Sequence, residues 1–166
     1  MTALTNAVLA HPALPRFLMV LALEWGTQRH YVETIREQTE ESGDPVYADV
    51  LKAHWVEEAQ HTKADALEIA RLAGEMNASE LSGAFDHILS LGGLVDVAFS
   101  GQAEREIETL QHVTGRTFPE REASTLRETL HRSLSAILAG VGLGHPNFTK
   151  VALELSRDGA AKIGIA

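Results

Sequence analysis

The chain contains no cysteine. This absence excludes disulfide bonds, iron–sulfur clusters, thiolate zinc sites and cysteine nucleophiles. It also agrees with a reducing compartment, in which proteins are not held together by disulfides. We therefore expect a cytoplasmic protein whose chemistry does not use thiols.

Positive charge and long apolar runs are also scarce. Lys and Arg number 14 against 23 Asp and Glu, so the formal net charge is -9, the wrong sign for binding nucleic acid or an anionic membrane. The longest apolar run near the start, residues 17–23, is far shorter than the ~20 residues that a membrane helix needs. Only Arg16 precedes this run, so a signal peptide is not expected. We expect no nucleic-acid partner and no membrane partner.

Aromatic residues make up only 5% of the chain, and runs of β-branched residues are short. Both features favour helices over strands. The length of 166 residues and an apolar content of 45% suit one domain, residues 1–166, with one core.

Helical periodicity and end signals predict four long helices and a short one. Asp44 and Pro45 mark the start of the second helix, and either Asn77 or Ser79 starts the third. The expected helices span 14–41, 45–73, 77–113, 119–138 and 148–157. Short connections make consecutive helices antiparallel, so we predict an all-α, antiparallel four-helix bundle with a short C-terminal helix. Its first two helices form one hairpin and the next two form another.

The motif Glu-x-x-His occurs at Glu58–His61 and again at Glu128–His131. Residues three apart share one face of a helix, so each pair can bind the same ion. Each motif alone is a weak signal, because glutamate is abundant. Their placement is more specific, since each lies on the second helix of a predicted hairpin.

The other two long helices should then each supply one inward carboxylate. Glu24 interrupts the apolar face of the first helix, and its midpoint with Glu58 falls near the turn at 42–45. On the third helix Glu104, Glu106 and Glu108 compete, and we favour Glu106 because it lies on the apolar face. Four carboxylates in one core would repel one another, and two divalent cations would offset that charge.

This order of motifs resembles the ferritin-like di-iron carboxylate superfamily over about residues 14–140. The resemblance implies a centre of two iron ions, or alternatively manganese, with two bridging glutamates, two terminal glutamates and one histidine on each metal. Carried over to this chain, these are Glu58 and Glu128 (bridging), Glu24 and Glu106 (terminal), and His61 and His131. His54, one turn before Glu58, is either a seventh ligand or a hydrogen-bond donor behind the ligands.

We therefore expect an O₂-activating oxidase or oxygenase that acts on a small-molecule substrate, working as a homodimer or small homo-oligomer. The first alternative is a ferroxidase or metal-handling protein of ferritin type. The second is a metal-free helical bundle that serves as an interaction module, which requires both Glu-x-x-His pairs to be coincidental.

Overall fold

The computed structural model describes residues 3–37 and 44–166, and every regular element among them is a helix. The α-helices and the two π-helical segments, η1 and η2, follow one another in this order: α1 (Ala3–Leu9), α2 (Ala13–His30), η1 (Tyr31–Ile35), α4 (Pro45–Ala73), α5 (Ala78–Thr114), α6 (Glu120–Ala136), η2 (Ile137–Gly142), α7 (Pro146–Leu155) and α8 (Arg157–Lys162). The prediction of an all-α fold is confirmed.

The helix ends follow local chemistry. Asp44 caps α4 by accepting hydrogen bonds from the backbone N–H groups of Val46 and Tyr47, with Pro45 in the first turn. Asn77 starts α5, and its side-chain oxygen accepts hydrogen bonds from the backbone N–H groups of Ser79 and Glu80. The Glu80 carboxylate in turn accepts a hydrogen bond from the backbone N–H of Asn77, which makes a capping box. These observations decide the start of the third long helix in favour of Asn77 over Ser79.

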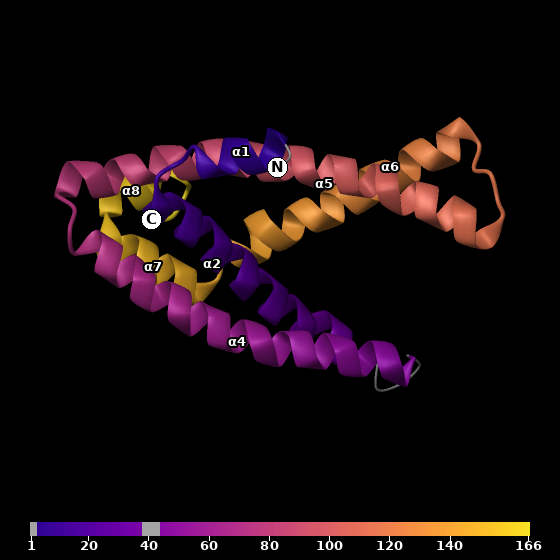
Figure 1. The fold of residues 1–166 in the computed structure, drawn as a ribbon, viewed down its shortest axis with the longest axis horizontal. Helices are drawn as coiled ribbons and strands as arrows, with labels where there is room; N and C mark the ends of the chain where they lie inside the picture. The colour runs from indigo at the N-terminus through magenta and orange to yellow at the C-terminus, as the bar shows by residue number, and fades with distance from the viewer. Residues whose placement is uncertain (1–2, 38–43) are drawn as a thin grey trace.

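The four long helices form the two expected hairpins. Helix α2 packs against α4, and α5 packs against α6. The hairpins share a base, where α2 also contacts α5 and η2, but α4 and α6 run to opposite sides of the molecule (Figure 1). A closed four-helix bundle is therefore not confirmed by this chain alone.

The main core lies at the base of the two hairpins. Its largest fully buried side chains come from α2, α4, α5 and α7 and include Leu18, Ile69, Phe85 and Phe148. The C-terminal segment adds a second short helix, α8, where the sequence predicted one helix over 148–157. A smaller cluster around Ile107 and Phe118 holds the far end of the α5–α6 hairpin together. The two clusters have no buried residue in common.

Helix α2 and segment η2 approach each other closely through two glycines. A Cβ atom on Gly26 would lie 2.8 Å from the carbonyl oxygen of Ile137, and one on Gly142 would overlap the carbonyl of Ala22. Only glycine permits this backbone contact. It fixes η2 against the segment of α2 that carries Glu24.

Helix α1 was not predicted, and two of the predicted long helices have other ends in the structure. The first helix, expected over 14–41, continues past α2 as the π-helical turn η1, and its predicted residues 38–41 lie outside the described residues. The fourth, expected to end at 138, continues as η2 to Gly142. Among the described helices no single one is long and apolar enough to cross a membrane, and one bent pair, Ala3–Leu9 with Ala13–Ile35 at 116°, passes that test by length and composition alone.

Candidate metal centre

Glu24 lies on the face of α2 that packs against α4. Its neighbours occupy the other faces: Trp25 stacks on His145 with ring centroids 5.4 Å apart, and Gly26 contacts η2. These contacts hold the helix in one rotation about its axis. The Glu24 side chain is only 11% exposed as a result.

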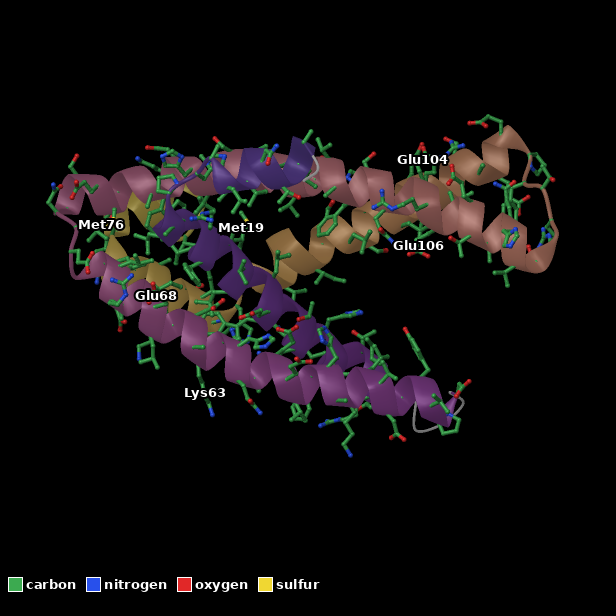
Figure 2. The ribbon with its side chains drawn as sticks, viewed as in Figure 1. Met19, Lys63, Glu68, Met76, Glu104 and Glu106 are labelled. Atoms are coloured by element: carbon green, nitrogen blue, oxygen red, sulfur yellow. The ribbon has the colours of Figure 1, made fainter. Side chains whose placement is uncertain are left out.

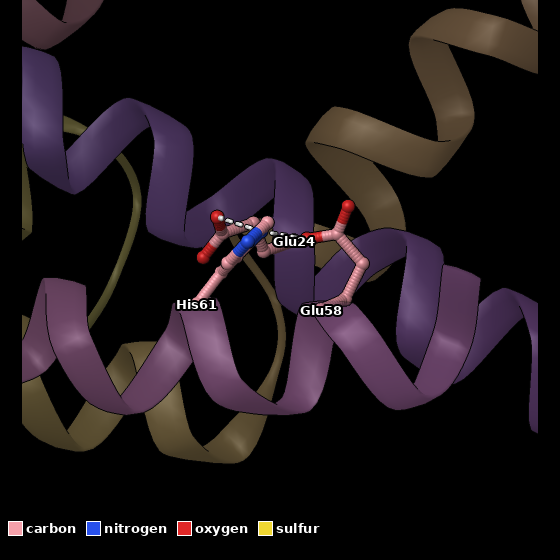
Figure 3. A group of neighbouring side chains, drawn as sticks. All are labelled: Glu24, Glu58 and His61. Atoms are coloured by element: carbon pink, nitrogen blue, oxygen red, sulfur yellow. Dashed lines mark ion pairs between the residues drawn. The ribbon is translucent and has the colours of Figure 1, made fainter. Parts of the chain in front are cut away.

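Glu58 and His61 meet Glu24 from α4 (Figure 3). His61 Nδ1 lies 3.8 Å from Glu24 Oε1 and 3.5 Å from Glu58 Oε2. One ligand atom from each of the three residues lies within 4.8 Å of the other two. The structure therefore brings together the three residues that the sequence predicted for the α2–α4 hairpin. We call them the hairpin triad.

Several polar atoms around the triad are buried without a hydrogen-bond partner. They are Oε2 of Glu24, Oε2 of Glu58, Oδ2 of Asp65 and Nε2 of Gln28. A buried polar atom without a partner costs about 1–3 kcal/mol, and more when it is charged. Three carboxylate oxygens in this state point to a positively charged ligand that would satisfy them.

Asp65 is the residue that the sequence interpretation missed. It lies one turn after His61 and two turns after Glu58, so it shares their helical face. Burial raises its pKa, and the nearby charge of Glu58 raises it further, while the hydrogen bond with Glu24 and the charge of His61 oppose the rise. The i, i+4 spacing from His61 was the available signal, and it extends Glu-x-x-His to Glu-x-x-His-x-x-x-Asp.

The electrostatics of Glu24 follow from this crowding. Burial, followed by the negative charges of Asp65 and Glu58, raises the pKa of Glu24 to about 8. Without a cation, Glu24 therefore keeps its proton at neutral pH. A divalent ion at the triad would favour the ionised form and displace that proton.

His54 lies beside the triad. Its Nε2 atom is 3.3 Å from Glu58 Oε1, the oxygen that faces away from His61, and its side chain is 53% exposed. This position fits a donor that orients Glu58 better than it fits a direct ligand.

The remaining predicted ligands, Glu106, Glu128 and His131, lie on the α5–α6 hairpin and do not join the triad. Glu106 is exposed and accepts a hydrogen bond from Gln102, whereas its neighbour Ile107 is buried. Exposed Glu104 forms an ion pair with Arg127 at 2.9 Å. Figure 2 shows Glu104 and Glu106 on α5, far from Lys63 and Glu68 on α4. The expectation that Glu106 occupies the apolar face is wrong, because that register belongs to Ile107 and Ala103.

The second Glu-x-x-His pair also has other partners. His131 Nε2 lies 2.8 Å from Asp96 Oδ1, and Ser135 donates to the same oxygen. Glu128 is exposed and accepts a hydrogen bond from Ser124. Within residues 3–37 and 44–166, the hairpin triad is the one group of three or more such side chains arranged to hold a metal ion.

An apolar pocket adjoins the triad. Tyr31 and Trp55 stack with ring centroids 5.5 Å apart and line a cavity of about 130 Å³ that also reaches Gln28, His54 and Glu58. Tyr31 begins the π-helical turn η1, a local rearrangement often found at functional sites. The two rings therefore line a small space beside a carboxylate of the triad.

No family model, curated protein or solved structure matches this chain.

Proposed function

We propose that this chain is a metal-binding carboxylate protein of ferritin-like type, which uses iron, or alternatively manganese, to activate O₂ for oxidation of a small molecule. The observation that carries the proposal is the hairpin triad with its buried, unpartnered carboxylate oxygens. The pairing of α2 with α4 and of α5 with α6 supports a ferritin-like arrangement of helices.

The charge balance of the triad favours a divalent ion. Two glutamates and nearby Asp65 bring several acidic groups into a mostly buried space. Ionised carboxylates in such a place are costly unless an opposite charge compensates them. Oxygen donors combined with one imidazole suit Fe(II) and Mn(II), and the absence of cysteine removes the softer thiolate donors.

The residues of this chain have distinct roles in the proposed centre. Glu24, Glu58 and His61 would hold the metal, and Asp65 and His54 would orient Glu24 and Glu58. When bound, iron supplies the electrons that reduce O₂. Tyr31 and Trp55 keep water away from one side of Glu58 and leave room for a small guest molecule.

Two alternatives remain as proposals of lower rank. A ferroxidase would use the same triad. It differs from the proposed oxidase because it oxidises iron itself, whereas the oxidase acts on a separate molecule. A metal-free interaction module leaves three buried carboxylate oxygens without hydrogen-bond partners, and this costs free energy that a bound cation would offset.

The test is metal binding by chelator-treated protein. Mn(II) titrated into the full chain, followed by calorimetry and elemental analysis, should give tight binding of one ion per triad. Glu24→Ala, Glu58→Ala and His61→Ala should each weaken binding by at least about 10-fold. Glu154→Ala serves as the control, because that glutamate is 66% exposed on α7. Tight binding that survives all three triad substitutions would contradict the proposal.

For oxidase activity, Fe(II) is added without oxygen and O₂ is then admitted. An oxidase should consume O₂ only until the bound iron is oxidised, and should turn over further when a reductant and substrate are present. Continued oxidation of free Fe(II), far beyond the bound amount, would support the ferroxidase instead.

A further inference from the structure

We propose that a second copy of this chain completes the metal centre, so that two hairpin triads meet across a two-fold axis and bind two divalent cations between the subunits. This inference rests on the proposed metal binding. It assigns the missing half of the ligand set to a partner subunit and not to the α5–α6 hairpin.

The triad by itself leaves a metal ion incompletely coordinated. It offers two carboxylates and one imidazole, whereas iron and manganese in oxygen-rich sites take up to six donors. His61, which is 50% exposed, lies at the edge of α4 and has one side open to solvent. The His61 side of the triad therefore faces outward, where another molecule can approach, whereas Glu24 and Glu58 are 11% and 13% exposed.

The α5–α6 hairpin is poorly placed to fill the gap. It diverges from α4 along its length (Figure 1), and α6 packs against α5 and η2. Its candidate histidine, His131, is bound to Asp96 at 2.8 Å, and Glu106 and Glu128 are hydrogen-bonded to neighbours on their own helices. Using these residues would require breaking these contacts and closing the two hairpins together.

The same edge of α4 carries exposed residues, of which Tyr47 and Val50 are apolar. Tyr47, His54 and His61 recur every seven residues, and Val50 lies between the first two, which places all four on one side of the helix. We call this row the α4 seam. Its side chains are half exposed or more: Tyr47 59%, Val50 60%, His54 53% and His61 50%. A seven-residue repeat is the spacing by which one helix packs along another.

Charge and symmetry favour a second copy of the chain as the partner. A two-fold axis brings the same surface of both chains together, so the α4 seam of one chain packs against the α4 seam of the other. Doubling the triad gives four glutamates and two histidines, and two divalent cations neutralise four carboxylates. Without metal, bringing the acidic side chains of two triads together costs free energy, so cation binding and dimer formation should be coupled.

The first experiment measures mass and metal content together. Native mass spectrometry of the full chain, after removal of metals and then with added Mn(II), should show a monomer that becomes a dimer carrying two Mn(II). A monomer that binds one Mn(II) tightly and never dimerises would overturn this inference and leave the proposed function intact. Failure to bind Mn(II) at all would overturn both.

Matched variants locate the interface. Val50→Lys puts a charge into the α4 seam and should abolish the dimer and weaken Mn(II) binding by at least about 10-fold. Val56→Lys is the control, because Val56 is also exposed, at 48%, but lies on a different side of the same helix. Equal effects of the two variants would overturn the proposed interface. Circular dichroism checks that both variants remain folded.

A second pair of variants asks which hairpin supplies the other ligands. The double variant with Glu128→Ala and His131→Ala should keep both Mn(II) binding and the dimer. Loss of Mn(II) in this variant would overturn the inference in favour of ligands from the same chain. Because the chain has no cysteine, Val50→Cys also introduces a single thiol, and a short bis-maleimide should crosslink it only when Mn(II) is present. Crosslinking of Val56→Cys to the same extent would count against the interface.

Discussion

At the scale of single residues, we expect Glu24 to contribute to the pH dependence of stability in the metal-free protein. Its carboxyl is buried among Asp65 and Glu58, and its pKa is raised to about 8 from an ordinary value of 4.5. The folded chain therefore keeps a proton on Glu24 that the unfolded chain has already released. Folding binds extra protons between these two values, so stability falls as pH rises through this window.

We expect the free energy of unfolding of the metal-free protein to decrease from pH 5 to pH 8. Glu24→Gln removes the titrating group and should flatten this dependence by on the order of 1–3 kcal/mol across the window, a discounted figure because the side chain is partly solvated. Urea unfolding in the presence of chelator, at several pH values, measures the slope. Glu154→Gln, an exposed glutamate, is the control. An unchanged slope in Glu24→Gln would show that Glu24 is ionised in the folded chain.

The affinity for Mn(II) should depend on pH in the opposite direction to the stability of the metal-free protein. The ion favours the ionised carboxylates, so its affinity should increase as pH rises through the window in which Glu24 loses its proton. Stability and metal affinity should depend on pH in opposite directions because the same buried carboxyl groups bind either protons or the metal ion.

At the scale of elements, the contact between α2 and η2 sets the rotation of α2 and hence the direction of Glu24. The two backbones approach so closely that a Cβ on Gly26 would lie 2.8 Å from the Ile137 carbonyl oxygen. In contrast, a Cβ on Gly93, inside α5, would meet no atom within 4 Å. These two helical glycines allow a direct comparison of a packed position with an open one.

Gly26→Ala should destabilise the fold by about 1–3 kcal/mol, because the methyl group forces α2 away from η2. Gly93→Ala should stabilise it by about 0.5–1 kcal/mol, because alanine is the better helix former. Urea unfolding measures both changes. Gly26→Ala should also weaken Mn(II) binding, since it displaces the neighbouring Glu24. If both substitutions stabilise the chain, α2 and η2 are not in backbone contact.

At the scale of the whole molecule, the two hairpins differ in how they are held. The α2–α4 hairpin joins the main core through α2, whereas the far end of the α5–α6 hairpin relies on a small cluster of Ile107, Phe118 and Ala123. Small apolar clusters give little stability on their own. The far end of the α5–α6 hairpin should therefore open more easily than the base.

Hydrogen exchange should show this difference directly. Amides in residues 104–128 are expected to exchange at least about 10-fold faster than those of the buried part of α2, because local opening there breaks few apolar contacts. Mn(II) should protect residues around the triad on α2 and α4 and leave 104–128 unchanged. Protection of 104–128 by Mn(II) would mean that the α5–α6 hairpin takes part in the metal centre.

Local signals in the sequence predicted the long helices and the three residues of the hairpin triad. Helical periodicity and the caps at Asp44 and Asn77 act over a few residues, so the pattern alone predicts where α4 and α5 begin. The turn predicted at 42–45 makes the first two long helices antiparallel, which is why residue spacing alone pairs Glu24 with Glu58 and His61. Asp65 follows from the same helical spacing, although the Glu-x-x-His motif does not include it.

Only the tertiary structure decided where the second hairpin points. Its direction depends on contacts between distant residues, such as Gly26 with η2 and Gly159 against the ring of Phe85. No local periodicity encodes such contacts, so the sequence predicted a closed bundle in which Glu106, Glu128 and His131 would meet the triad. The sequence also left the rotation of α5 about its axis undecided. Glutamates at 104, 106 and 108 alternate with other residues, and the packing of Ala103 and Ile107 determines which face of the helix is buried.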